Sequence, residues 1–184
     1  MVLTESDYSK LKHWDNAPNF ELIATDNNNY SFDSFKEARA FLIVFICNHC
    51  PYVKAKFGTI NEIANEFRMK GLVTICINSN DAEKYPEDNF ENMQKLMQEM
   101  GFEFYYLYDE TQKTAKGYGA VCTPDPFLFD GNRKLVYHGR IDNGHGPNGF
   151  ATSYELKAAI EQLLSGRQIT VEEHPSIGCS IKWK

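Results

Sequence analysis

A run of apolar residues that ends at two cysteines and a proline constrains this chain most. Residues 41–46 are all apolar, and Cys47, Cys50 and Pro51 follow them. A continuous apolar run of this length is typical of a central β-strand that is buried on both faces. Beyond Pro51, apolar residues recur at steps of three and four, which predicts an amphipathic helix that ends near Gly71. The segment therefore predicts a buried strand, a turn that carries two thiols, and a helix.

Strand and helix patterns alternate along the rest of the chain. They predict a last helix that follows Thr152, other helices at 90–100 and 111–118, and strands at 18–24, 72–78, 105–108, 127–129 and 135–137. The last two strands flank residues 130–132, Asp-Gly-Asn, which favour a β-hairpin because Asp-Gly tolerates positive φ angles. Thr152 and Glu155 have the spacing of a capping box. This order predicts an α/β fold in which helices flank a central mixed sheet.

The length and the composition limit the class of protein. A chain of 184 residues fits one domain, with a core at about 17–165 between an N-terminal extension and an extended C-terminal tail at 166–184. The formal net charge of −6 argues against binding to nucleic acid, which needs a basic surface. No apolar run is long enough to cross a bilayer, and the acidic start lacks the pattern of a secretion signal. We therefore expect a cytoplasmic protein without a membrane partner.

Reactive groups in such sheets gather where a strand ends and the next helix begins. Cys50 stands at that place, because Pro51 favours the first turn of a helix. A sulfur at a helix N-terminus faces unpaired N–H groups and the positive end of the helix dipole, which stabilise the thiolate. The pKa of such a cysteine falls below its free value of about 8.5. The sequence therefore predicts that Cys50 is a nucleophile.

Cys47 and His49 leave several roles open. Cys47 precedes Cys50 by three residues, a spacing that allows a disulfide if the backbone turns between them. His49 lies between the two thiols and is a candidate proton donor or acceptor. The three residues are also candidate metal ligands with Cys122 or Cys179, but the chain lacks the second paired motif of most structural zinc sites. We expect neither a metal nor a cofactor.

Four segments of the chain resemble one family. They read APNFEL at 17–22, FLIVFICNHCPYV at 41–53, CTPDPFLFDGNRKLVYHGRIDN at 122–143 and GCSIKWK at 178–184. Together they resemble the thioredoxin-like superfamily and, within it, the peroxiredoxin-like group related to alkyl hydroperoxide reductase and thiol-specific antioxidant proteins. The last segment is typical of one branch of that group. The resemblance extends from about residue 17 to residue 184 and implies a thioredoxin-like fold.

The resemblance also implies where a substrate or partner would bind. Pro124 matches the cis-proline that lies against the reactive cysteine in thioredoxin-like folds. Thr123 would present backbone polar groups to a bound thiol partner. His49 and Pro51, which flank Cys50 in the sequence, are further candidates to contact a substrate or partner.

The same resemblance favours Cys50 as the attacking cysteine, with Cys47 as an additional thiol. If the strand is aligned with the family differently, Cys47 is the attacking cysteine and Cys50 is the resolving one. The chain also departs from the peroxiredoxin pattern. Ile43 and Cys47 stand where that group has a proline and a threonine, and neither Arg133 nor Arg140 matches its helper arginine. Because the hydroxyl and the cation stabilise the transition state of peroxide cleavage, the resemblance implies only a weak peroxidase.

Three cysteines are candidates to resolve a bond to Cys50, in the order Cys47, Cys122, Cys179. Cys179 lies in the tail, where alternating apolar residues predict an extended segment that packs on the body of the protein. Cys76 lies in the middle of a predicted strand and is expected to be a core residue.

These observations lead us to expect a thiol–disulfide oxidoreductase or a peroxiredoxin-like antioxidant protein. Its substrate would be a protein disulfide or a peroxide, and a thiol reductant would recycle it. The alternative is a non-enzymatic thioredoxin-fold binding module that uses Cys47, His49 and Cys50 to hold a metal ion or a partner protein. The sequence leaves the oligomeric state open, a homodimer included.

Overall fold

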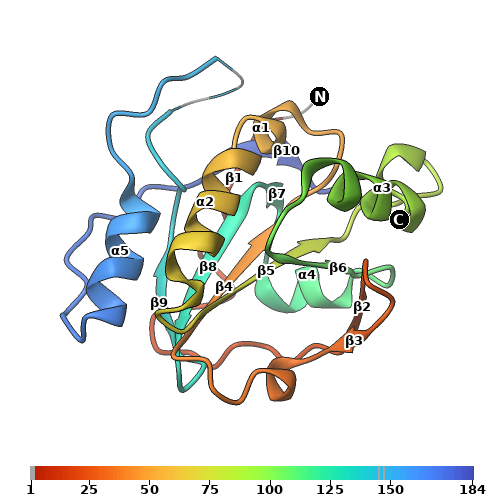
Figure 1. Cartoon of the computed structure of the whole chain (residues 1–184). Coiled ribbons are helices and arrows are strands. Elements are labelled where there is room, and N and C mark those ends of the chain that lie inside the picture. Colours follow the sequence, from red (N-terminus) through yellow and green to blue (C-terminus); the bar gives the residue numbers. More distant parts are fainter. Residues whose placement is uncertain (1–2, 145, 147) are drawn as a thin grey trace.

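The computed structural model describes residues 3–144, 146 and 148–184, and its centre is a seven-stranded mixed sheet (Figure 1). The strands are Leu22–Ala24 (β2), Asn29–Tyr30 (β3), Ala40–Phe45 (β4), Leu72–Asn78 (β5), Tyr105–Tyr108 (β6), Asp125–Asp130 (β8) and Leu135–His138 (β9). They lie in the order β3-β2-β6-β5-β4-β8-β9. β4, β5 and β6 are parallel, and the outer strands pair antiparallel with their neighbours. The predicted mixed sheet is confirmed.

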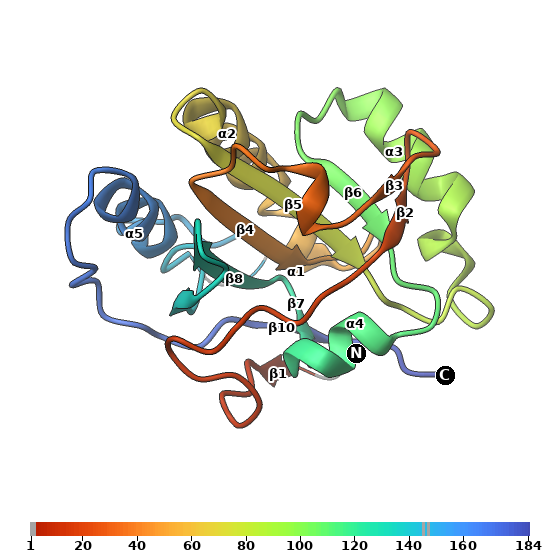
Figure 2. The ribbon, with the colours of Figure 1, turned by 90° about the horizontal axis from the view of Figure 1, so that it is seen from below.

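Helices cover both faces of this sheet. They are Pro51–Lys54 (α1), Phe57–Arg68 (α2), Phe90–Met100 (α3), Lys113–Tyr118 (α4) and Glu155–Leu164 (α5), with 3-10 turns at Phe32–Ser34 (η1) and Pro86–Asp88 (η2). Figure 2 shows α2, α3 and α5 on one face and α4 on the other. Within the described residues, none of these helices is both long and apolar enough to cross a membrane.

The central strand β4 shows why this sequence forms a layered core. All of its residues are buried. Successive side chains of a strand point to opposite faces of the sheet. Leu42 and Val44 accordingly belong to the apolar cluster formed with α2, α3 and α5, whereas Ile43 and Phe45 belong to the cluster formed with α4. The strand is apolar at every position because both of its faces are covered.

The two ends of the chain meet in a second sheet of three strands. Its strands are Leu3–Glu5 (β1), Ile177–Ser180 (β10) and Cys122–Thr123 (β7), and β10 pairs antiparallel with both neighbours. Figure 1 shows this sheet beside α1, at the end of the seven-stranded sheet where β4 stops. The predicted extended and packed tail is confirmed. The sequence does not predict its pairing with β1, because three residues carry too little periodicity to indicate a strand.

The predicted capping box of the last helix is wrong. Tyr154 is the N-cap residue of α5, and no side chain caps that end of the helix. The carboxylate of Glu155 instead accepts hydrogen bonds from Ser153 Oγ at 2.8 Å and from Arg140 Nε at 3.1 Å. Because Tyr154 is the N-cap, Glu155 stands at the first position of the helix and not at the third, where a capping box needs it.

Three further predictions are corrected in detail. The β8–β9 hairpin is confirmed, but its positive φ angle of 63° belongs to Arg133 and not to Gly131. The strand predicted at 18–24 is confined to β2. The helix predicted after Pro51 is divided into α1 and α2, because Lys56 N bonds to Val53 O, three residues back, and not to the carbonyl four residues back. The break lets Lys56 Nζ reach Asp142 Oδ1 at 2.5 Å, and both side chains are largely buried.

Candidate thiol site

Cys50 lies at the N-cap of α1, as the sequence predicts. Its backbone is extended, and Pro51 occupies the first position of the helix. The Cys50 carbonyl accepts the first bond of the helix, from Lys54 N at 3.0 Å. Because the N–H groups of the first helical turn have no partner within the helix, they are free to bind the sulfur at the cap.

Strand β10 brings Cys179 directly onto Cys50. The two sulfur atoms are not bonded and lie 2.6 Å apart, well inside ordinary van der Waals separation. The antiparallel register of β10 and β7 sets Cys179 opposite Thr123. The Thr123–Pro124 peptide is cis, as the family resemblance implies. The structure thus gathers Cys50, Cys179, Thr123 and Pro124, which lie far apart in the sequence.

Thr123 contacts both thiols of the Cys47–Cys50 turn. Its carbonyl oxygen is 3.5 Å from Cys50 Sγ, and its hydroxyl is 3.6 Å from Cys47 Sγ. Cys47, Cys50 and Cys179 are each at most 1% exposed. Strand β10 packs against Cys50 through Cys179, and all three thiols are closed to solvent.

The three neighbouring thiols have very different pKa values. The pKa of Cys50 falls to about 5, chiefly because the Cys47 thiol hydrogen-bonds to its thiolate, with further help from Cys179 and from Val53 N. The pKa of Cys47 is raised by the same interaction with Cys50, by burial and by the charge of Asp88. Burial and the nearby Cys50 raise the pKa of Cys179 to about 12. The arrangement favours one thiolate that is flanked by two protonated thiols.

The other two cysteines do not join this group. Cys122 lies on β7, but its thiol faces the carbonyl oxygen of Ser176 at 3.9 Å. Burial and the charge of Asp125 raise the pKa of Cys122, so its thiol stays protonated. Cys76 is fully buried in β5, and burial raises its pKa as well. Its expected place in the core is confirmed.

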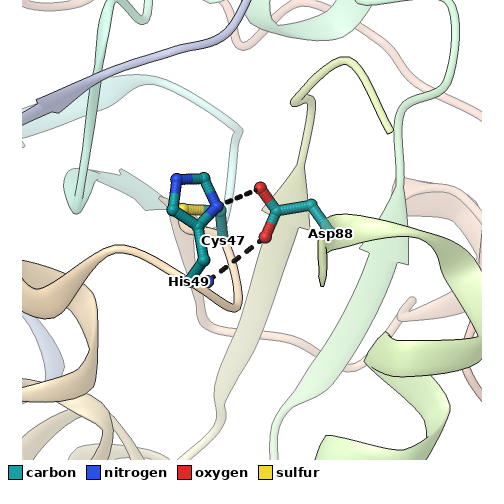
Figure 3. A group of neighbouring side chains, drawn as sticks. All are labelled: Cys47, His49 and Asp88. Carbon is teal, nitrogen blue, oxygen red and sulfur yellow. Dashed lines mark hydrogen bonds and ion pairs between the residues drawn. The ribbon is translucent and has the colours of Figure 1, made fainter. Parts of the chain in front are cut away.

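His49 and Cys47 form a second group with Asp88, a residue that the sequence does not single out. One donor atom of each of these residues lies within 4.8 Å of the others. Figure 3 shows the Asp88 carboxylate bonded to both the ring and the backbone of His49. Asp88 comes from η2, and no local sequence pattern links it to a turn 39 residues earlier. Only the fold brings the two segments together.

The second group is a poor fit for a metal ion. His49 Nδ1 and Asp88 Oδ2 are 2.6 Å apart, which is a short hydrogen bond. Two ligands of one tetrahedral zinc ion, each at about 2.05 Å, would stand about 3.3 Å apart. The Asp88 carboxylate also accepts bonds from Asn48 N at 2.8 Å and Asn80 Nδ2 at 2.7 Å. A carboxylate that is already this well bonded favours an orienting role over metal binding.

One cavity lies away from this chemistry. It has a volume of about 540 Å³ and is lined by residues at the start of β5 and β6, the end of α2 and the segment from η1 to β4. None of the three clustered thiols lines it. The site at Cys50 is defined by contacts between side chains and not by a large open pocket.

Comparisons with known proteins agree with this description of the fold. Residues 14–138 match the model of the AhpC/TSA family. An uncharacterized conserved protein from Geobacillus kaustophilus is 44% identical, with a TM-score of 0.93 over 100% of this chain and 97% of that one. A hypothetical protein, SMc02350 from Sinorhizobium meliloti 1021, is 38% identical, with a TM-score of 0.93 over 98% of each chain.

A more distant structure identifies the fold. The thioredoxin domain of the thiol-disulfide oxidoreductase BVU-2223 from Bacteroides vulgatus is 20% identical, with a TM-score of 0.59 over 70% of this chain and 88% of that one. A comparison with curated proteins gave no match. The family match spans more than half of the 184 residues. The chain therefore belongs to the AhpC/TSA family and has a thioredoxin-like fold.

Proposed function

We propose that this protein is a thiol–disulfide oxidoreductase in which Cys50 attacks and Cys179 resolves. The observation that carries the proposal is the contact between their sulfur atoms at the N-terminus of α1. The lowered pKa of Cys50 supports its role as the attacking thiolate, because the thiolate is the reactive form. The contact favours Cys179 as the resolving cysteine over Cys122, whose thiol faces Ser176.

The proposed reaction exchanges one disulfide for another. The Cys50 thiolate attacks a substrate disulfide, so that a sulfur–sulfur bond to Cys50 forms and the substrate bond breaks. The substrate thiolate that leaves takes up a proton. The Cys179 sulfur then attacks Cys50, releases the second substrate thiol and passes its own proton to that leaving group. The substrate is reduced by two electrons. An external thiol reductant then reduces the Cys50–Cys179 disulfide to two thiols.

Peroxide is a second, slower oxidant in this proposal. The Cys50 thiolate would take one oxygen and the O–O bond would break, so that the other oxygen takes up a proton and leaves as an alcohol or as water. The Cys179 thiol would then displace water from the sulfenic acid and form the Cys50–Cys179 disulfide. Arg133 pairs with Asp33, and Arg140 pairs with Glu155, so both guanidinium groups are already bound to carboxylates. Within the described residues, neither of them bonds to Cys50. The transition state of O–O cleavage would therefore lack the cation that accelerates it.

The cellular setting belongs to the same proposal. A working cycle that returns three neighbouring thiols to the reduced form suits a reducing compartment, and we propose the cytoplasm. The partners would be a disulfide or peroxide substrate and a thiol reductant. The acidic net charge of −6 gives no reason to propose nucleic acid as a further partner.

Peptide mapping of the oxidised protein tests the proposal. The reduced protein is treated with a small disulfide or with hydrogen peroxide, quenched with an alkylating reagent, digested and analysed by mass spectrometry. We expect a Cys50–Cys179 disulfide, formed faster with the disulfide reagent. Cys122→Ser is the matched control, because Cys122 is as buried as Cys179 and lies on the neighbouring strand. This variant should still form the bond, and Cys179→Ser should not.

Two outcomes would reject the proposal. If Cys50 reacts no faster than the fully buried Cys76, it is not a nucleophile. If the purified protein contains stoichiometric zinc that is released only when Cys47 and Cys50 are blocked, the binding-module alternative replaces the redox function.

A further inference from the structure

The group formed by Cys47, His49 and Asp88 has features of a proton-transfer site. The Asp88 carboxylate is fully buried, and four N–H donors fix its orientation. One of them is His49 Nδ1, at 2.6 Å. Because a carboxylate accepts hydrogen bonds, Nδ1 carries the proton, and the lone pair of the neutral ring lies on Nε2. Asp88 thus holds His49 in one tautomer.

The position of His49 suits the exchange of protons with both the site and the solvent. Its side chain is 23% exposed, whereas the neighbouring Cys47 is 1% exposed. The imidazole ring stacks on Tyr85, with ring centroids 5.7 Å apart and an interplanar angle of 7°. The ring therefore has a fixed orientation, with one of its nitrogen atoms within 4.8 Å of the buried Cys47 sulfur and part of the side chain exposed to water.

Cys47 needs a neighbouring proton acceptor if it is to attack a disulfide at Cys50. Its hydrogen bond with Cys50, its burial and the charge of Asp88 all raise its pKa, so Cys47 is protonated at rest. Only a thiolate attacks a disulfide efficiently. The Cys47 thiol, whose sulfur contacts the same residue, Thr123, as Cys50 Sγ, therefore remains inactive unless a neighbouring base removes its proton.

We infer that His49, oriented by Asp88, accepts the proton of Cys47 when Cys47 attacks a disulfide at Cys50. This inference rests on the proposed role of Cys50 and adds a second resolving route. A Cys47–Cys50 bond forms, the bond from Cys50 to Cys179 or to a substrate sulfur breaks, and the sulfur that leaves receives the proton from His49. No external oxidant or reductant is consumed. Asp88 acts as a positioning residue.

The test follows a mixed disulfide in a protein that can resolve it only through Cys47. The full chain carries Cys122→Ser and Cys179→Ser and is mixed with 4,4′-dithiodipyridine. Attack by Cys50 releases one thiopyridone, and the displacement by Cys47 releases a second one. Adding Cys47→Ser should abolish the second release, and the first release should persist at a lower rate because the Cys50 thiolate loses its main hydrogen-bond donor. The two phases separate the reaction of Cys50 from the reaction of Cys47.

His49→Gln and Asp88→Asn are then compared in this background. At pH 7 we expect each to slow the second phase by about 100-fold, the size of a general-base effect, and to slow the first phase far less. The difference should vanish near pH 10, where hydroxide removes the Cys47 proton directly. The groups that face the imidazole are Asp88 and Tyr85 of the neighbouring turn and Cys47, and Lys182 lies 5.9 Å from the Tyr85 ring. Lys182→Met should preserve the profile.

The outcomes distinguish the inference from the proposed function. A second phase that is unaffected by His49→Gln, or is slowed equally at every pH, overturns the inference. A missing first phase overturns the proposed function as well. His13→Gln is the matched control, because His13 also pairs with a carboxylate but lies at an exposed position. If Asp88→Asn does not fold, His49→Gln alone decides the question.

Discussion

Gly178 lies against the cis peptide so closely that a Cβ atom at this position would stand 1.9 Å from the Thr123 carbonyl oxygen. The next residue is Cys179, so this close approach sets the distance between β10 and Cys50. We expect Gly178→Ala to push β10 outward and to lower the free energy of unfolding by about 1–3 kcal/mol, as overpacking does. It should also slow the formation of the Cys50–Cys179 disulfide. Urea unfolding and peptide mapping measure the two effects.

Gly58→Ala provides the matched control for this substitution. Gly58 lies in α2, and a Cβ atom there would meet nothing within 4 Å. Alanine at an open helical position stabilises by about 0.5–1 kcal/mol relative to glycine. An equal loss of stability in both variants would show that the steric contact at Gly178 is not the cause.

The reactivity of Cys50 should follow a low titration midpoint. Because its pKa is lowered to about 5, the thiolate fraction and the alkylation rate should rise as the pH rises through about 5 and level off above it. Cys47→Ser removes the largest cause of the lowered pKa and should move the midpoint upward. Iodoacetamide labelling from pH 4 to pH 9, with the modified peptide identified by mass, provides the measurement. A midpoint near 8.5, the value of a free cysteine, would contradict the prediction.

Ser6 should hold the N-terminal segment and the tail together. Its hydroxyl donates to Asp125 Oδ1 at 2.7 Å and accepts from Ser176 N at 3.2 Å, all in buried surroundings. Ser6→Ala removes both bonds, and we expect it to lower the free energy of unfolding by about 1–3 kcal/mol. Amide hydrogen exchange in β10 should accelerate. Ser9→Ala, at an exposed residue whose hydroxyl binds Asp7, should change neither quantity.

Tyr106 should stabilise the turn that carries Cys47 and Cys50. Its buried hydroxyl donates to Asn48 Oδ1 at 2.9 Å. Tyr106→Phe leaves this amide oxygen without its donor and should cost about 1–3 kcal/mol in thermal or urea unfolding. Tyr118→Phe is the control, because the buried hydroxyl of Tyr118 has no hydrogen-bond partner among the described residues. The second variant should be as stable as the parent, and an equal loss in both would contradict the prediction.

The sequence predicts the parts of this fold that depend on local patterns. The apolar run at β4 and the proline after Cys50 locate the central strand and the start of the helix, because burial and capping act within a few residues. The family resemblance adds the cis peptide before Pro124. The cysteine that we propose as the nucleophile is therefore located before any long-range contact is known.

The remainder of the site depends on contacts that no local pattern encodes. Cys179 ranks last among the predicted resolving residues, yet its sulfur is the one that touches Cys50, because the pairing of β10 with β7 places it there. Residues 80–88 form only a polar loop in the sequence, and the importance of Asp88 emerges when that loop folds against His49. Such contacts depend on how segments far apart in the chain pack together.

Thr123 contacts or pairs with all three clustered cysteines at once. Its hydroxyl lies beside Cys47, its carbonyl lies beside Cys50, and its backbone pairs with Cys179. Each disulfide that these thiols can form would alter a different part of this one residue. Isotope labelling of threonine would therefore make Thr123 a spectroscopic reporter, in which the methyl and carbonyl resonances distinguish the redox states of the site without any added probe.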